Sequence, residues 1–379
     1  MTPLPPLAGV RVVEIAGIGP TPFAAMLLAE LGADVVRIDR LDDDGMVARM
    51  TKALNRSRPS IALDLKADGA AEVVLRLLDG ADILIEGLRP GVMERLGLGP
   101  DLVRARNPRL IYGRMTGWGQ DGPWAQRAGH DITYAAITGA LHLVGEAERP
   151  IPPANVLADF GGGTLYLLVG LLSALHARES TGHGQVVDAA MVDGAASLIT
   201  MIYGMYAGDF WRDERAANLL DGGTPFYDTY RCADGKHLAV GPLEPQFHAE
   251  FLRILDLELP GGQFDAARWP EHRALIGQAL ATRTRDEWAA LFDGTDACVA
   301  PVLSLAEAPS HPHLVARGVF TEVDGQILPR VAPRFSDSQP LEPTPARAAG
   351  ADSTAYLLGH GFTDAEVSDL LGRGVLRQA

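Results

Sequence analysis

The chain has 379 residues, enough for two domains, and 47% of them are hydrophobic and 21% charged. These proportions are typical of folded globular proteins and exclude a largely disordered chain. The 33 Lys and Arg residues against 48 Asp and Glu residues give a net charge of −15. Because an acidic molecule repels phosphate backbones and anionic lipid surfaces, we expect no nucleic-acid partner and no membrane partner.

The acidity is uneven along the chain. Residues 31–120 hold 14 Lys and Arg residues and 13 Asp and Glu residues, a net charge of +1, so the remaining residues carry −16. A region without the general negative charge is suited to an anionic ligand. Chance variation of surface charge gives the same count, so this feature alone decides nothing.

The cysteines and the apolar segments exclude several further classes. Cys232 and Cys298 lie far apart with no Cys-x-x-Cys or Cys/His cluster, which argues against a zinc site or a disulfide framework, and we expect both to be small core residues. The first apolar stretch is interrupted by Glu14 and Pro20 and has no basic segment before it. We therefore predict neither a signal peptide nor a transmembrane helix, and we expect a cytoplasmic protein.

Strands and helices alternate through the first 116 residues. The pattern predicts strands at 10–16, 34–39, 60–65, 82–87 and 109–115, and helices at 22–30, 68–80, 90–97 and 100–106. Such alternation favours an α/β fold with an open, mostly parallel, Rossmann-like sheet covered by helices on both faces.

Helices dominate the middle of the chain, and a smaller α+β region follows. We expect helices at 129–143, 162–178 and 191–208, a strand at 185–190, a hairpin of 225–231 with 236–240, and helices at 245–255, 270–281, 285–292 and 363–371. Residues 329–353 are rich in Pro, Ala and Ser, which is typical of an extended segment lying over another surface.

The first strand is followed by a glycine turn with Gly17 and Gly19, and Asp39 ends the second strand. A dinucleotide fingerprint needs a third glycine where Pro22 stands, and proline does not allow the same close helix–strand packing. An NAD-dependent oxidoreductase is therefore a weak hypothesis, and a plain strand-to-helix turn is the simpler one.

Basic side chains follow several of the predicted strands. Because the carboxyl ends of parallel strands meet in one crevice, a set gathered there suits a ligand with several phosphates, whereas scattered surface charge explains any single member. The set is Arg37, Arg40, Lys66, Arg89 and Arg95.

Three short motifs carry residues suited to acid–base chemistry. They are Gly129-His130-Asp131, Asp159 followed by Phe160 and three glycines, and Glu244-Pro245-Gln246. Taken singly, each has an ordinary structural explanation: a polar histidine near a helix start, an N-cap acid and a solvated glutamate. Their combination is what calls for a functional explanation.

The combination resembles the family III CoA-transferases, and the likeness covers nearly the whole chain, loosening after about residue 335. It is carried by PLAGVRVVEIAGIGP, LGADVVRIDR, LDLK, EGLRPGVMERLGLGP, RMTGWGQDGPWAQRAGHDITY, ADFGGGTLYLLVGLL, GQVVDAAMVDG, DGGTPFYDTYRCADG and VGPLEPQF. The resemblance implies a large CoA-binding domain at 1–200 completed by 325–379, a linker at 201–224, and a small α+β domain at 225–324. It also implies that two subunits interlock as a homodimer.

The resemblance further implies a set of site residues. The catalytic residues would be His130, Asp159 and Glu244. The substrate- and CoA-binding residues would be Arg40, Leu63, Asp64, Leu65, Lys66, Gly87, Leu88, Arg89, Arg95, Gly129, Asp131, Ile132, Thr133 and Tyr134. Leu88 departs from the pattern that the resemblance implies, in which an aromatic residue is expected at this position.

The activity that the resemblance implies is inversion at the α-carbon of a 2-methyl-branched acyl-CoA thioester. No cofactor motif is present, so CoA is expected only as part of the substrate, and two bases must handle the two faces of the α-carbon. We expect His130 and Asp159 to do so, Glu244 to orient His130, and the N–H groups of residues 161–163 to bind the enolate oxygen. The alternatives are a CoA-transferase with Asp159 as nucleophile and a non-catalytic CoA-binding protein.

Overall fold

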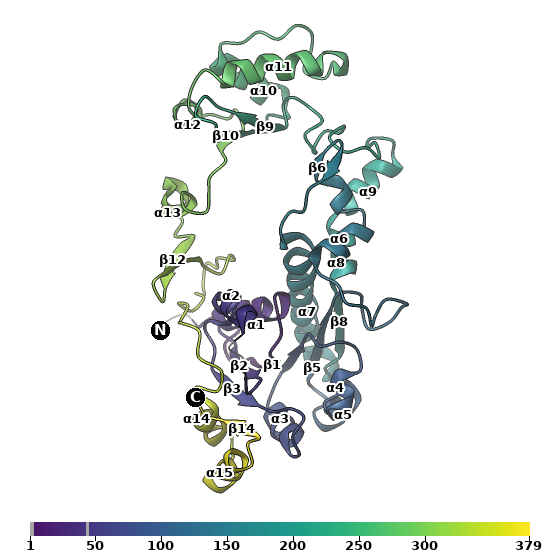
Figure 1. Cartoon of the computed structure of the whole chain (residues 1–379), viewed down its shortest axis with the longest axis vertical. Helices are drawn as coiled ribbons and strands as arrows, with labels where there is room; N and C mark the ends of the chain where they lie inside the picture. The colour runs from purple at the N-terminus through teal and green to yellow at the C-terminus, as the bar shows by residue number, and fades with distance from the viewer. Residues whose placement is uncertain (1–3, 43–44) are drawn as a thin grey trace. The chain divides into compact units, whose positions relative to one another are not determined.

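The protein folds into two units in a computed structural model, which describes residues 4–42 and 45–379 (Figure 1). Unit 1 comprises Met1–Thr138, Ala154–Leu198 and His313–Ala379, and unit 2 comprises Gly139–Pro153 and Ile199–Pro312. The domain prediction treated residues 201–224 as a linker, whereas here the helix α9 (Thr200–Ala207) stands in that stretch and residues 139–153 group with unit 2.

Unit 1 is built on a seven-stranded sheet with the order β14-β3-β2-β1-β4-β5-β8. The strands are β1 (Arg11–Ile15), β2 (Asp34–Asp39), β3 (Ser60–Leu63), β4 (Ile83–Glu86), β5 (Ile111–Thr116), β8 (Val186–Ala190) and β14 (Leu376–Arg377). All neighbours pair in parallel except β14, which runs antiparallel to β3. The strand order reverses between β1 and β4, and in open parallel sheets ligands bind at that point.

Helices cover both faces of this sheet. The α-helices that lie within the described part of unit 1 are α1 (Pro20–Glu30), α2 (Met46–Met50), α3 (Ala70–Leu78), α4 (Val92–Arg95), α5 (Pro100–Arg106), α6 (Asp131–Ile137), α7 (Leu165–Thr181), α8 (Met191–Leu198), α14 (Ser353–Gly359) and α15 (Asp364–Gly372). Alternate strand residues, among them Val13 and Val36, join one buried cluster with α3, α5 and α15. The opposite face meets α7, where Gly113 of β5 lies against Leu167 and Leu171. The predicted α/β class is thereby confirmed.

The C-terminal segment returns to unit 1. The hairpin of β12 (Phe320–Val323) and β13 (Gln326–Pro329) precedes a stretch without helix or strand up to α14. Along it, Leu341 N–H donates to the Glu30 carbonyl and the Ser57 N–H donates to the Thr344 carbonyl. Figure 1 shows α14 and α15 beside β14. The extended segment predicted for residues 329–353 is therefore present.

Unit 2 contains a three-stranded antiparallel sheet of β9 (Asp228–Arg231), β10 (His237–Val240) and β11 (Val299–Pro301). Helices α10 (Pro245–Leu255), α11 (Trp269–Leu280) and α12 (Arg285–Phe292) pack with it around a core that includes Phe251, Ile276 and Trp288. The remaining elements here are α9, the small hairpin of β6 (Gly145–Glu146) and β7 (Arg149–Pro150), and the start of α13 (Pro312–Ala316).

Three predicted helices differ from the structure. The helix expected at 129–143 is shorter, because α6 covers only Asp131–Ile137 and a separate 3-10 helix covers Leu141–Leu143. The other two differ in winding. The helix expected at 191–208 is two helices, α8 and α9, with Ile199 at the break. The helix expected at 162–178 starts earlier, as a π-helix over Val156–Thr164 that continues into α7. Apolar periodicity indicated the helical stretches but not these changes in winding, because both depend on what each segment packs against.

One helical stretch in the described part of the chain, Val156–Thr181, is long and apolar enough to cross a membrane by length and composition alone. A core helix of a soluble protein passes the same test, so a single case is weak evidence. The predicted absence of a membrane partner stays a prediction.

Candidate functional site

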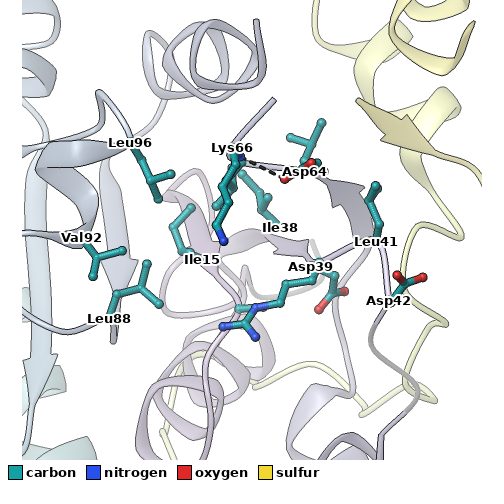
Figure 2. Close-up of a pocket in the computed structure, with 14 residues that line it drawn as sticks. Ile15, Ile38, Asp39, Leu41, Asp42, Asp64, Lys66, Leu88, Val92 and Leu96 are labelled. Carbon is teal, nitrogen blue, oxygen red and sulfur yellow. Dashed lines mark hydrogen bonds between the residues drawn. The ribbon is translucent and has the colours of Figure 1, made fainter. Parts of the chain in front are cut away.

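A crevice opens at the carboxyl ends of β1, β2 and β3, next to α4 (Figure 2). Its volume is about 480 Å³. It is lined by Ile15, Ala16, Ile38, Asp39, Arg40, Leu41, Asp42, Leu63, Asp64, Leu65, Lys66, Leu88, Val92 and Leu96. The crevice adjoins β1, where the strand order reverses, so it lies where the topology places a ligand.

Six of the predicted CoA-binding residues line this crevice: Arg40, Leu63, Asp64, Leu65, Lys66 and Leu88. Figure 2 shows the Lys66 side chain reaching into the pocket, while its backbone N–H donates to Asp64 Oδ1 at 3.0 Å. Aliphatic side chains form the walls, and the cations of Arg40 and Lys66 lie in the lining with the carboxylates of Asp39, Asp42 and Asp64. The two cations are suited to a phosphate group.

The other predicted CoA-binding positions stand outside the lining. Gly87, Arg89 and Arg95 are exposed but do not line the crevice, and Arg37 is buried in an ion pair with Asp39. Arg37 therefore belongs to the sheet rather than to a ligand site. Arg37 lies within β2, and its place near the strand end did not reveal this, because alternate residues of a strand point to opposite faces.

The loop of residues 87–89 is held by a buried carboxylate that the sequence did not single out. Glu86 is fully buried, and its Oε2 accepts the Leu88 N–H at 2.7 Å while its Oε1 accepts Arg114 Nε–H at 2.9 Å. Arg114 also pairs with Glu94 at the start of α4. Burial raises the pKa of Glu86, and the hydrogen bonds from Leu88 and Arg114 oppose that rise. This network ties the loop to two strand ends.

His130 stands at the N-cap of α6 with its side chain exposed. Its backbone N–H donates to Thr133 Oγ1 at 3.0 Å, and the Thr133 hydroxyl donates to the His130 carbonyl at 2.7 Å. These hydrogen bonds satisfy backbone groups at the start of the helix. They also fix the position of the His130 backbone, from which the imidazole side chain extends. Of the neighbouring predicted residues, Ile132 and Thr133 are exposed.

Tyr134 lies on the inner side of the same helix. Its ring packs edge-on against Trp118 at 4.7 Å between centroids, and it fills the space that side chains on Gly117 and Gly129 would occupy. Burial, and then the nearby Asp159 and Asp131 carboxylates, raise the pKa of Tyr134 to about 12. The phenol therefore keeps its proton at neutral pH and can donate a hydrogen bond.

Asp159 lies within the π-helix rather than at an N-cap, which corrects the simpler structural interpretation of this residue. Its side chain accepts a hydrogen bond from Asn155 Nδ2 at 3.2 Å and lies against Gly19 after β1. Burial raises the pKa of Asp159, and the Asp131 charge adds to the rise, whereas the Asn155 hydrogen bond and His130 oppose it. Asp159 N–H donates to Oδ2 of Asp131, the residue directly after His130, so the structure places His130 and Asp159 on two elements that contact each other.

The glycines after Asp159 serve packing. A Cβ on Gly162 would lie 2.6 Å from the Ala195 backbone nitrogen, and a Cβ on Gly194 would overlap the Gly162 carbonyl, so π-helix and α8 touch backbone to backbone. Residues 161–163 lie inside the π-helix, where their N–H groups bond to carbonyls five residues earlier. The expectation that they bind an enolate oxygen stays a prediction.

Glu244 is the N-cap residue of α10 in unit 2, where its side chain is exposed and caps no backbone N–H. Its charge raises the pKa of the neighbouring Cys298 thiol, second to burial. Cys298 is exposed, which corrects the expectation of a core residue, whereas Cys232 is buried as expected. Among the described residues, no three His, Cys, Asp or Glu side chains gather as metal ligands do.

Together these features define an α/β protein with a crevice at the carboxyl ends of its central strands, and with His130 and Asp159 on two neighbouring helices. Residues 7–353 match CoA-transferase family III, and the chain belongs to that family. It is 44% identical to the alpha-methylacyl-CoA racemase of Mus musculus, with 96% of each chain covered, and 46% identical to the human alpha-methylacyl-CoA racemase, with 86% of each covered.

Solved structures agree with the fold. A CaiB/BaiF family protein from Brucella suis superposes with a TM-score of 0.81 at 27% identity, covering 95% of this chain and all of the other. A human succinyl-CoA:glutarate CoA-transferase is 26% identical over all of this chain and 91% of its own length. The family thus includes relatives with racemase names and relatives with transferase names.

Proposed function

We propose that this protein is an isomerase, an alpha-methylacyl-CoA racemase that interconverts (R)- and (S)-2-methylacyl-CoA thioesters. The observation that carries the proposal is the linked placement of His130 and Asp159, in which the Asp159 N–H donates to the side chain of Asp131, the residue directly after His130. Two titratable groups of different type at one position suit removal of a proton from one face and delivery of a proton to the other. The identity to the two racemases named above supports the same reaction.

In the proposed mechanism, CoA lies in the crevice and places the thioester near the pair. One of the two residues takes the α-proton, the C–H bonding electrons pass to the thioester carbonyl as an enolate, and the protonated partner returns a proton to the opposite face. We assign His130 to the (S) face and Asp159 to the (R) face. Glu244 is proposed to orient His130 and stabilise its protonated form.

Racemisation of a single epimer tests this proposal. Chiral analysis of (S)-2-methylacyl-CoA should show conversion to an equal mixture by the wild-type protein. His130→Ala and Asp159→Ala should each reduce the rate by at least about 10² to 10⁴-fold, the contribution typical of a positioned acid or base. If both variants racemise like the wild-type protein, the two-base assignment is wrong.

The second candidate is a family III CoA-transferase, favoured by the family match that residues 7–353 give. In that reaction Asp159 attacks the thioester carbonyl, CoA thiolate leaves, and a mixed anhydride forms on the carboxylate. Mass spectrometry of the protein with an acyl-CoA donor and a carboxylate acceptor separates the two. A covalent acyl or CoA adduct that requires Asp159, with no loss of epimeric purity, would favour the transferase.

The proposal needs no separate cofactor, since the two bases belong to the chain and CoA is part of the substrate. Dialysis against a chelator should leave the racemisation rate unchanged. A loss of activity that a metal ion restores would contradict this part of the proposal.

The proposal also includes a cytoplasmic location and a homodimer. One face of α7 supports the dimer, because it leaves Leu165, Val169 and Leu172 at 50%, 60% and 39% exposure. These residues lie on one stripe of the helix, and an apolar stripe of this kind is typical of a covered surface. Light scattering should give twice the chain mass, and Val169→Glu should reduce it.

A further inference from the structure

The carboxylate of Asp131 is turned into the protein, not toward a ligand. Asp131 is the first residue of α6, directly after His130, and only 3% of it is exposed. Its Oδ2 accepts the backbone N–H of Ala158 at 2.6 Å and that of Asp159 at 2.8 Å. Its Oδ1 is buried with no hydrogen-bond partner. Its side chain therefore serves the π-helix, which differs from the substrate contact expected from the resemblance.

The two hydrogen bonds lie where a helix most needs an outside acceptor. The first N–H groups of a helix have no partner within it, and the π-helix begins at Val156. Asp131 supplies an acceptor to two of them, across 27 and 28 residues of sequence, and one of the two belongs to Asp159 itself. The position of the Asp159 backbone therefore depends on a side chain in another element.

The same residue is covalently joined to His130. The His130 backbone is fixed by the local hydrogen bonds with Thr133, so the start of α6 is held independently of the Asp131 carboxylate. Asp131 consequently forms a direct link, one peptide bond on one side and one hydrogen bond on the other, between the two residues of the pair.

We propose that Asp131 is a positioning residue, which sets the spacing of His130 and Asp159 by anchoring the start of the π-helix. This inference rests on the proposed function. A buried carboxylate with one oxygen unpaired destabilises a fold, so its presence is explained by a task that a neutral core residue does not perform. Its charge has a second effect, because it raises the pKa of Asp159.

Two substitutions distinguish the hydrogen bonds that Asp131 accepts from the effect of its negative charge. Asp131→Ala removes both, so the start of the π-helix loses its acceptor. Asp131→Asn is matched in shape, and its carbonyl oxygen can accept the same two N–H groups while the charge is lost. The readouts are kcat and KM for a 2-methylacyl-CoA, exchange of the α-proton in D₂O from each epimer, and the pH profile of kcat.

The expected results differ between the two variants. Asp131→Ala should reduce kcat by about 10²-fold, since small misplacements of a reacting group cost that much, with KM changed less than about twofold. The rate of α-proton exchange should fall most for the epimer whose exchange is lost in Asp159→Ala. Asp131→Asn should keep kcat within about fivefold, and the acidic limb of its pH profile should move to lower pH because the pKa of Asp159 falls.

Thr133→Val is the matched control at the other end of the link. It removes the hydroxyl that holds the His130 backbone, so exchange should fall most from the opposite epimer. Thermal unfolding checks that each variant is folded at the assay temperature. If Asp131→Ala reduces both exchanges equally, or if Asp131→Asn leaves the pH profile unchanged, the inference is overturned. If the wild-type protein exchanges neither epimer, it is the proposed function that fails.

Discussion

The crevice and the acid–base pair differ in how their residues are brought together. The crevice is built mainly from the ends of the parallel strands β1, β2 and β3, so most of its lining residues are placed by the strand that they end or follow. The pair depends on contacts between elements: α6 with the π-helix through Asp131, and the π-helix with α8 through Gly162 and Gly194. A substitution in the crevice should therefore affect only the contacts of that residue with the ligand. A substitution in an element that supports His130 or Asp159 should affect catalysis even where the substituted residue does not touch the substrate.

The largest effect is expected from Gly194→Ala. Its Cβ would overlap the Gly162 carbonyl, so α8 must move away from the π-helix that carries Asp159. We expect a kcat at least about 100-fold lower and a free energy of unfolding lower by about 1–3 kcal/mol, measured by steady-state kinetics and denaturant titration.

Gly204→Ala in α9 is the control for Gly194→Ala. A Cβ on Gly204 meets nothing within 4 Å, and alanine favours a helix, so this substitution causes no clash. Equal kinetics for Gly194→Ala and the wild-type protein would contradict the packing role.

Arg40→Ala should change binding rather than chemistry. Arg40 lines the crevice as an exposed cation, and loss of a charge-assisted contact to a phosphate should raise KM for acyl-CoA by about tenfold. We expect kcat to change less than about threefold. Arg317→Ala, an exposed arginine of unit 1 outside the crevice lining, should leave KM unchanged. An unchanged KM for Arg40→Ala would remove this residue from the CoA site.

A smaller effect is expected from Glu86→Gln. Leu88 and Arg114 donate to different oxygens of Glu86, and in the amide one of these two positions becomes an NH₂ group that cannot accept, so one hydrogen bond is lost and the loop of residues 87–89 loosens at the crevice wall. KM should rise by about three- to fivefold with kcat retained. Glu94→Gln is the matched control, since it also contacts Arg114 but leaves the Leu88 hydrogen bond intact. The prediction fails if both variants raise KM equally.

The smallest effect is a pH shift in Asn155→Ala. The Asn155 hydrogen bond lowers the pKa of Asp159, so its removal raises that pKa further. The unprotonated base is lost as pH falls through this pKa, so the acidic limb of the kcat profile should move to higher pH, opposite to the shift expected for Asp131→Asn. A shift of the same sign in both variants would contradict the electrostatic account.

The sequence predicted the residues of the crevice better than the residues that hold His130 and Asp159 in position. Buried β-branched strands and the basic residues after them placed Arg40 and Lys66 at the crevice, because the end of each strand can be read from a local pattern. The motifs also singled out His130 and Asp159. Asn155, Glu86 and the anchoring role of Asp131 were missed. Their hydrogen bonds join residues that only the folded chain brings together, and a spacing of 27 residues between Asp131 and Ala158 has no sequence signature.

The glycines after Asp159 show the same limit. Three consecutive glycines indicate close approach of a backbone, but the sequence does not say whether a ligand or another helix approaches. Here it is α8, at Ala195 and Gly194. The sequence therefore singled out the three glycines, but only the structure shows that they allow α8 to pack closely against the π-helix.

The most direct test of the two-base account is α-proton exchange in D₂O, followed by mass spectrometry on each pure epimer of a 2-methylacyl-CoA. The wild-type protein should incorporate deuterium at the α-carbon of both epimers while it racemises them. We expect Asp159→Ala to abolish exchange from the (R) epimer and His130→Ala from the (S) epimer. Racemisation and exchange at the wild-type rate in both variants would show that these residues are not the two bases.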